Sequence, residues 1–143
     1  MANILRNNVG TVLSQTLTSG VANNAYSTES LTVDNTTNKA LLADFELAVV
    51  YAIAPVAGAL QLIEVDYALD NITAGPTPSA TMLGRVVGTF SPMATTSNTA
   101  TSWSATCKAV PIAQKSKYYV FNNATGQALS ATAALKAQCW TPG

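Results

Sequence analysis

The stretch ADFELAVVYAIAPVAGALQLIEVDYALD, residues 43–70, decides the fold class. Apolar side chains occupy every odd position from its start to Ile53, and acidic residues stand between the first of them. A period of two places one side of a segment in a core, which indicates a β-strand. Pro55 and Gly58 predict a turn, and the second alternating run, residues 61–70, predicts an antiparallel hairpin with the first.

Runs with a period of two continue on both sides of this stretch. The predicted strands lie at 11–19, 25–33, 43–53, 61–70, 82–90, 103–109, 118–121 and 129–139. The last has the Ala, Leu, Lys and Gln content of a helix, but its sustained alternation favours a strand. Segments rich in Pro, Gly, Ser and Thr, 71–80 and 91–102, predict loops. About eight strands and no helix predict an all-β fold, a jelly-roll-like antiparallel β-sandwich.

The length of the chain indicates its domain organisation. With 143 residues the chain has the size of one domain, and we expect a single β-sandwich domain over residues 11–143. Residues 1–10 are a candidate N-terminal arm, because an extended terminus can add a strand to the sheet edge of a neighbouring molecule. A frayed end without a role is the alternative. The partner contacts expected in this arm are Asn3, Ile4, Leu5 and Arg6.

Charge is scarce in this chain and unevenly distributed. Charged residues make up 10% of it, against roughly 25% in an ordinary soluble domain. Residues 1–70 contain seven acidic and two basic side chains, a formal net charge of −5. Residues 71–143 contain five basic side chains and no acidic ones, a formal net charge of +5. These charges either neutralise each other across neighbouring strands or form patches that guide contact between subunits. Low charge suits an assembly, because net charge opposes association; a low-charge monomer is the alternative. No dense Lys/Arg cluster predicts nucleic-acid binding.

No segment of the sequence predicts secretion or a membrane span. The first ten residues, MANILRNNVG, are too polar for a signal peptide, and no uninterrupted apolar run is long enough to cross a bilayer. We therefore expect a protein made in the cytoplasm, with no membrane partner. The sequons at Asn35, Asn71 and Asn123 then predict turn residues rather than glycosylation sites, and Cys107 and Cys139 predict buried free thiols.

The residues that most enzyme and metal sites need are missing. Without histidine the Ser-His-Asp and Cys-His arrangements cannot form, and two cysteines supply at most half of a zinc site. We expect no enzyme activity, no cofactor and no metal. Two carboxylate pairs are the exception to this expectation, because Asp44 with Glu46, and Glu64 with Asp66, each share one face of a strand. If those strands pair, the four could bind calcium or act as an acid–base pair; a solvated outer face is the alternative.

Residues 117–131, KYYVFNNATGQALSA, combine an aromatic strand with a turn. Asn, Thr and Gly suit a chain reversal, and the aromatic residues predict a central strand of the sandwich. We expect Tyr118 to face outward, and Asn122 and Asn123, at the tip, to contact a partner. Exposed aromatic side chains also bind sugars, which leaves a carbohydrate-binding or host-recognition module as an alternative; burial in the core is the more common outcome.

Residues 43–70 and the stretch YYVFNNATGQALSATAALKAQCW, residues 118–140, carry a family resemblance. A strand like DFEL precedes an AP-x-AG turn, and a later strand ends in NN-x-TGQ. This pattern resembles a group of small virion structural proteins of tailed bacteriophages, of the head decoration or cement type. The likeness covers roughly residues 40–140 and consists of strand and turn signatures.

The resemblance implies a jelly-roll structural protein on the capsid exterior. Such proteins bridge neighbouring major capsid protein subunits, usually as homodimers or homotrimers, and have no catalytic role. Many copies acting together supply their binding strength. The implied location is the virion, after synthesis in the host cytoplasm, with neither nucleic acid nor a membrane as partner. A tail or head–tail connector component of the same particle is the alternative.

Overall fold

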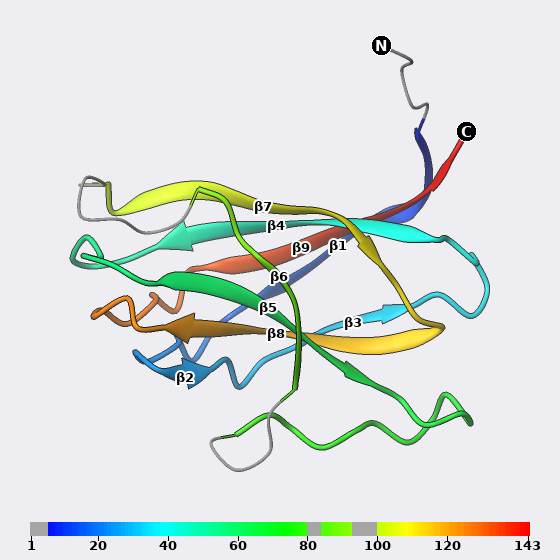
Figure 1. The fold of residues 1–143 in the computed structure, drawn as a ribbon, viewed down its shortest axis with the longest axis horizontal. Helices are drawn as coiled ribbons and strands as arrows, with labels where there is room; N and C mark the ends of the chain where they lie inside the picture. Colours follow the sequence, from blue (N-terminus) through cyan, green and yellow to red (C-terminus); the bar gives the residue numbers. More distant parts are fainter. Residues whose placement is uncertain (1–5, 80–83, 93–99) are drawn as a thin grey trace.

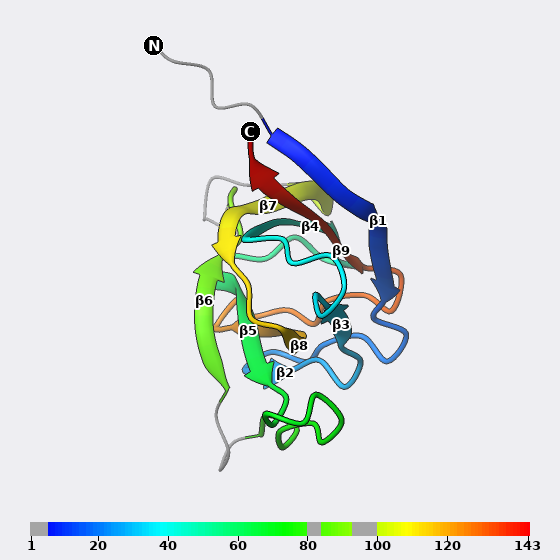
Figure 2. The same ribbon diagram turned by 90° about the vertical axis from the view of Figure 1, so that its right-hand side faces the viewer.

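The computed structural model describes residues 6–79, 84–92 and 100–143, which form β-strands and loops without a helix (Figure 1). The strands are β1 (Arg6–Thr16), β2 (Ala25–Tyr26), β3 (Leu31–Asp34), β4 (Leu42–Val50), β5 (Ala59–Asp66), β6 (Arg85–Thr89), β7 (Ser102–Pro111), β8 (Lys115–Asn123) and β9 (Ala134–Pro142). They build two antiparallel sheets that lie face to face, and Figure 2 shows the two layers almost end-on. The all-β sandwich predicted from the sequence is thereby confirmed.

The strand order of the two sheets is that of a jelly roll. One sheet has four strands in the order β1-β9-β4-β7. The other has the order β2-β8-β5-β6, and β3 also pairs with β8, farther along the same edge of that strand. Because β2 and β3 act as one interrupted strand, the sandwich has eight strand positions, four in each sheet. This arrangement is the double-sheet, Greek-key architecture of the jelly roll.

The hairpin predicted between the two central runs is wrong. β4 lies in the four-stranded sheet and β5 in the five-stranded sheet, so the turn with Pro55 and Gly58 joins two sheets instead of two paired strands. Alternation shows which side of a strand is buried and says nothing about its neighbour. A reversal between sheets and a reversal within one sheet need the same turn residues, so the sequence pattern could not separate them.

The core lies between the sheets and is built from the inward positions of every long strand. β4 alternates regularly, with Ala43, Phe45, Leu47 and Val49 buried and the residues between them half-buried. Close packing of such side chains supplies most of the stability of a fold of this size. The predicted run continued to Ile53, but β4 ends at Val50 and the Ile53 side chain is exposed.

The first and the last strand of the described chain both belong to the four-stranded sheet. β1 begins at Arg6 and pairs with β9 from Pro142 inward, so residues 6–10 of the predicted arm 1–10 lie in the edge strand of this sheet. Residues 1–5 lie outside the described structure. Figure 1 shows the start of β1 and the end of β9 leaving the sandwich together. The predicted strand 129–139 is shifted, because residues 130–133 form a turn before β9 begins.

Candidate partner-binding surfaces

The N-terminal partner contacts predicted from the sequence fall into two groups. Asn3, Ile4 and Leu5 lie outside the described residues. Arg6 is exposed at the edge of the sheet, where its guanidinium lies 4.4 Å from the centre of the Trp140 ring and forms an ion pair with Asp44. Asp44 also accepts hydrogen bonds from Trp140 Nε1 (3.1 Å) and from the Ala109 backbone N–H (2.8 Å). Arg6 therefore helps to fix the ends of β1 and β9 to β4.

The prediction that Tyr118 faces outward is wrong. Its side chain is fully buried between the sheets and packs against Phe45, with 4.6 Å between the ring centres. The hydroxyl donates a 2.7 Å hydrogen bond to Oε2 of Glu64, which is itself buried and ion-paired with Arg85. Both faces of β8 carry apolar side chains, so its alternation gave no sign of which face points inward. Tyr119, on the outer face, is also buried, so these two tyrosines form no exposed platform for a sugar.

Asn122, predicted as a partner contact, is buried at the centre of a polar cluster. Its Nδ2 donates hydrogen bonds to the backbone carbonyls of Val21 (3.0 Å) and Gln127 (2.8 Å). Its Oδ1 accepts one from Thr125 Oγ1 (2.5 Å) and a longer one from the Tyr51 hydroxyl (3.4 Å). The cluster joins the two sheets at the end where β8 reverses. Asn122 is therefore a structural residue in the folded chain.

Asn123 lies at the end of β8 and is half-buried. The turn that follows it has left-handed backbone at Ala124 (φ 54°) and Gly126 (φ 79°), which confirms the predicted turn chemistry. Two N–H groups of the turn donate to side chains from the loop before β2: Ala124 N to Asn24 Oδ1 and Gly126 N to Asn23 Oδ1. Asn123 is the only one of the two predicted tip residues that reaches the surface.

The two carboxylate pairs do not come together. Asp44 and Glu46 lie on the outer face of the four-stranded sheet, whereas Glu64 and Asp66 belong to the other sheet. Within residues 6–79, 84–92 and 100–143, no three Cys, Asp or Glu side chains are grouped closely enough to hold a metal ion. Glu64 also departs from the alternative of a solvated outer face, because it points inward to Tyr118.

The cysteines agree with the prediction of buried free thiols. Cys107 on β7 and Cys139 on β9 are both unpaired and buried in the four-stranded sheet. Burial raises the pKa of each thiol above its usual range, and the carboxylate of Asp44 adds to this at Cys107. Raised thiol pKa values disfavour the reactive thiolate, so neither cysteine has the properties of a nucleophile.

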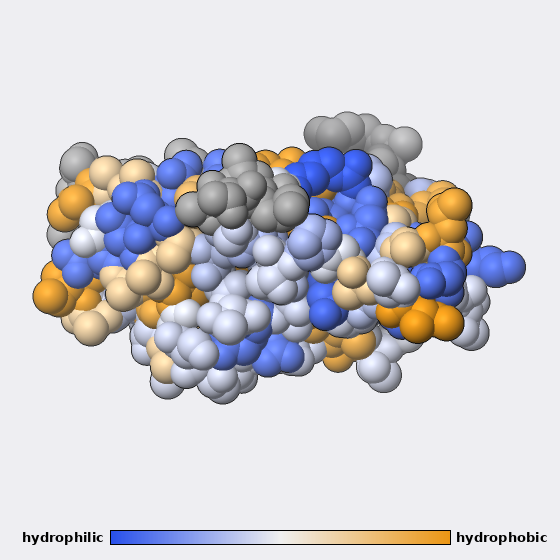
Figure 3. All heavy atoms as spheres, turned by 90° about the horizontal axis from the view of Figure 1, so that it is seen from below, coloured by the Kyte–Doolittle hydropathy of each residue, from blue (hydrophilic) through white to orange (hydrophobic). Residues whose placement is uncertain are grey.

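Three loops at one end of the sandwich, residues 35–41, 67–74 and 112–114, form a surface that we call the loop end. It exposes the side chains of Leu41 (63%), Leu69 (103%) and Ile72 (80%). Two hollows, of about 580 and 240 Å³, lie here and share Asn71 and Gln114, which are joined by a 3.0 Å hydrogen bond. Figure 3 shows apolar surface at both ends of the elongated molecule. Exposed apolar side chains grouped on a surface mark contact sites for partners.

Asp70 fixes the shape of the loop that carries Leu69 and Ile72. Its Oδ1 accepts hydrogen bonds from the backbone N–H groups of Ile72 (2.8 Å) and Thr73 (2.9 Å), and its Oδ2 accepts one from Thr73 Oγ1 (2.9 Å). The backbone N–H groups of Thr73 and Ile72 hold the pKa of this carboxyl below its ordinary value. The apolar tip is thus presented by an ordered turn. The alternating run had predicted Leu69 as a strand residue, but β5 ends at Asp66.

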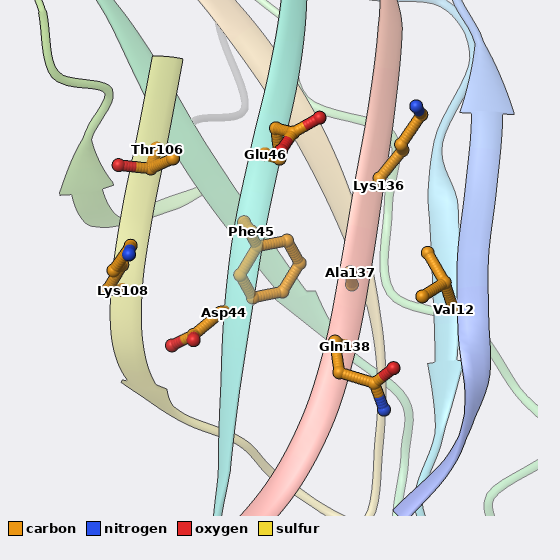
Figure 4. Close-up of a pocket in the computed structure, with 9 residues that line it drawn as sticks. All are labelled: Val12, Asp44, Phe45, Glu46, Thr106, Lys108, Lys136, Ala137 and Gln138. Carbon is orange, nitrogen blue, oxygen red and sulfur yellow. The ribbon is translucent and has the colours of Figure 1, made fainter. Parts of the chain in front are cut away.

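A second candidate surface is the outer face of the four-stranded sheet, shown in Figure 4. A shallow hollow of about 370 Å³ lies over β4, β7 and β9 and reaches Val12 on β1. Glu46 lies between Thr106 on β7 and Lys136 on β9, its register partners on either side. The sequence placed Glu46 and Asp44 on one face of a strand, but it could not show which cationic residues lie beside them. That information required the register of β9 and β7 against β4.

No protein-family model matches the chain, and no curated protein or solved structure matches it. Among the residues that the structure describes, no helix is long and apolar enough to span a membrane.

Proposed function

We propose that the protein is a non-enzymatic structural component of a bacteriophage particle, a decoration or cement protein that binds the outside of the capsid and bridges major capsid protein subunits. The observation that carries this proposal is the loop end, where Leu41 on one loop and Leu69 and Ile72 on an adjoining loop expose apolar side chains. Isolated exposed apolar residues are ordinary, but here Leu69 and Ile72 are presented together by the turn that Asp70 orders. The sequence resemblance of residues 43–70 and 118–140 directs the proposal to the capsid.

The architecture supports a role that depends on contact with a large partner. A jelly roll is a rigid scaffold, and its loops are free to vary in shape at either end. Apolar side chains at the centre of a small contact supply most of its binding energy, and a polar rim excludes water around them. At the loop end the exposed Lys39 and Asp70 flank the apolar residues and can form such a rim. Modest affinity at one contact is sufficient when many copies bind one lattice.

Replacing Leu41, Leu69 and Ile72 together by serine is expected to weaken binding to capsids that lack the protein by at least about tenfold. Loss of apolar contact area at these three positions should reduce the binding free energy by at least about 1.4 kcal/mol, which corresponds to a factor of ten in affinity. Co-sedimentation with purified capsids measures it. The matched control is the pair Ile53→Ser and Val56→Ser, which removes exposed apolar side chains (64% and 58%) from the turn between β4 and β5, outside the loop end.

The control should bind like the unmodified chain and restore the resistance of the particle to heat and low salt. Equal binding by both sets of variants would contradict the role of the loop end. Equal fragility of capsids with and without the unmodified protein would contradict the cement function itself. The number of copies in each particle distinguishes a cement protein from a tail or head–tail connector component, because a connector occupies one vertex while a cement protein covers the whole lattice.

A further inference from the structure

The outer face of the four-stranded sheet carries charged side chains that the fold itself does not use. Across the part of the chain that the structure describes, Glu46, Lys108 and Lys136 form no ion pair and no side-chain hydrogen bond. Asp44, by contrast, is occupied by Arg6, Trp140 and the Ala109 N–H. Charged groups without a partner on a shaped, polar sheet face point to a partner with complementary charges.

The register arranges this face in rows that run across the strands. Glu46 on β4 lies beside Lys136 on β9 at the same level, as Figure 4 shows. One row away, Ala48 on β4 lies beside Ala134 on β9. Alanine side chains keep the surface low at this level, so another molecule can approach the backbone closely. The centre of the face thus combines one carboxylate, one ammonium group and two methyl groups on two adjacent strands.

We propose that this face binds the same face of a second copy of the chain, in a two-fold dimer whose axis runs parallel to the strands, midway between β4 and β9. Such an axis places β4 of each copy opposite β9 of the other. Glu46 of each copy then faces Lys136 of the other, so two reciprocal ion pairs form. Ala48 faces Ala134 of the other copy in the same way. A contact in which residue i meets j and j meets i is the pattern that a two-fold interface requires.

The outer strands of the sheet are compatible with the same axis. It brings β7 opposite β1 of the second copy, so Thr106, in the row of Glu46, faces Ser14, in the row of Lys136. Lys108 faces the irregular part of β1 near Val12, where there is no charge. No two like charges are placed opposite each other. The hollow of about 370 Å³ beside Glu46 leaves room for the Lys136 side chain of the second copy.

The balance of charge argues for a second copy over other occupants. A nucleic acid needs an excess of cations, whereas this face alternates in sign. Val12 is the one exposed large apolar side chain among the residues that line the hollow, so this face offers little contact area to an apolar partner. A face that supplies both halves of the same ion pair on neighbouring strands is complementary to itself. The dimer can be tested with the purified chain alone, and it does not depend on the proposed capsid function.

Two charge reversals test the dimer by sedimentation velocity at low and high salt. The unmodified chain should form dimers that weaken as salt is raised, because exposed charge pairs are screened. E46K alone and K136E alone should each weaken dimerisation by at least about tenfold, since both reciprocal pairs become repulsive. The control K117E changes the net charge by the same amount as K136E, but on the opposite sheet, and it should dimerise like the unmodified chain.

The decisive sample is an equal mixture of the E46K and K136E chains. In the mixed dimer each reversed side chain faces an opposite charge, so dimerisation should return to within about threefold of the unmodified chain. Inside each chain the neighbouring positions on β4 and β9 still carry like charges, so an effect on folding alone cannot produce this rescue. Monomers of the unmodified chain at all concentrations, or a mixture that stays monomeric, would overturn the proposal.

Discussion

Replacing Tyr118 by alanine is expected to lower the free energy of unfolding by about 3–5 kcal/mol, the range for removing a buried aromatic ring from a core. The ring is fully buried against Phe45, and its hydroxyl is a hydrogen-bond donor to the buried carboxylate of Glu64. Urea unfolding measures the change. Phe121→Ala is the matched control, because this half-buried ring lies on the other face of β8, stacked on Tyr26. Its cost should be less than half as large.

The conservative variant Tyr118→Phe isolates the hydroxyl. It leaves Glu64 with one donor fewer, which should cost about 1–3 kcal/mol. Burial raises the pKa of the Tyr118 hydroxyl. The contribution of this group is therefore complete below the ordinary tyrosine pKa of about 10. At higher pH the unfolded chain ionises first and stability is lost. The stability difference between the unmodified chain and Tyr118→Phe should narrow above that pH; a constant difference would contradict the buried position.

Replacing Asn122 by alanine is the second change with a large expected effect, a loss of about 2–3 kcal/mol. The substitution removes two donated hydrogen bonds and the acceptor of Thr125, and a buried polar group without its partner costs about 1–3 kcal/mol. The control is Asn123→Ala, one residue along the strand. Across the described residues the Asn123 side chain forms no hydrogen bond, so this variant should change stability by less than about 0.5 kcal/mol.

The comparison of these two asparagines also tests their functional assignment. Asn122→Ala, under conditions where it remains folded, should bind capsids as the unmodified chain does, because its side chain reaches no surface. Thermal unfolding and capsid co-sedimentation of both variants supply the measurements. Equal stability of the two variants would show that the polar cluster around Asn122 does not hold the sheets together.

The strands could be predicted from the sequence wherever one face was polar and the other apolar. β4 is the clearest case, because Asp44 and Glu46 stand between buried neighbours. On β8 the same reasoning could not orient the strand, since Tyr118, Tyr119 and Val120 are all buried. The jelly-roll class followed from the number and spacing of strands, but the pairing of β4 with β7 and β9 depends on contacts distant in sequence. The period of the apolar residues does not show which strands pair.

Most of the two candidate surfaces could not be predicted from the sequence. Leu69 and Ile72 flank the loop signal around Asp70 and Asn71, so an early end of the strand was the one available indication that they are exposed. Leu41 joins them only because the loops before β4 and β8 meet the loop after β5. Glu46 and Lys136 are ninety positions apart and become neighbours through strand register. Residues brought together by long-range pairing cannot be identified from local pattern.

A reconstruction of the virus particle at a resolution that identifies the sandwich tests the central proposal most directly. We expect the jelly roll at repeated positions over the whole capsid exterior, with the loop end, residues 35–41, 67–74 and 112–114, against the major capsid protein. Density for the chain at one vertex only, in the tail, or on the capsid with the loop end facing solvent would contradict it.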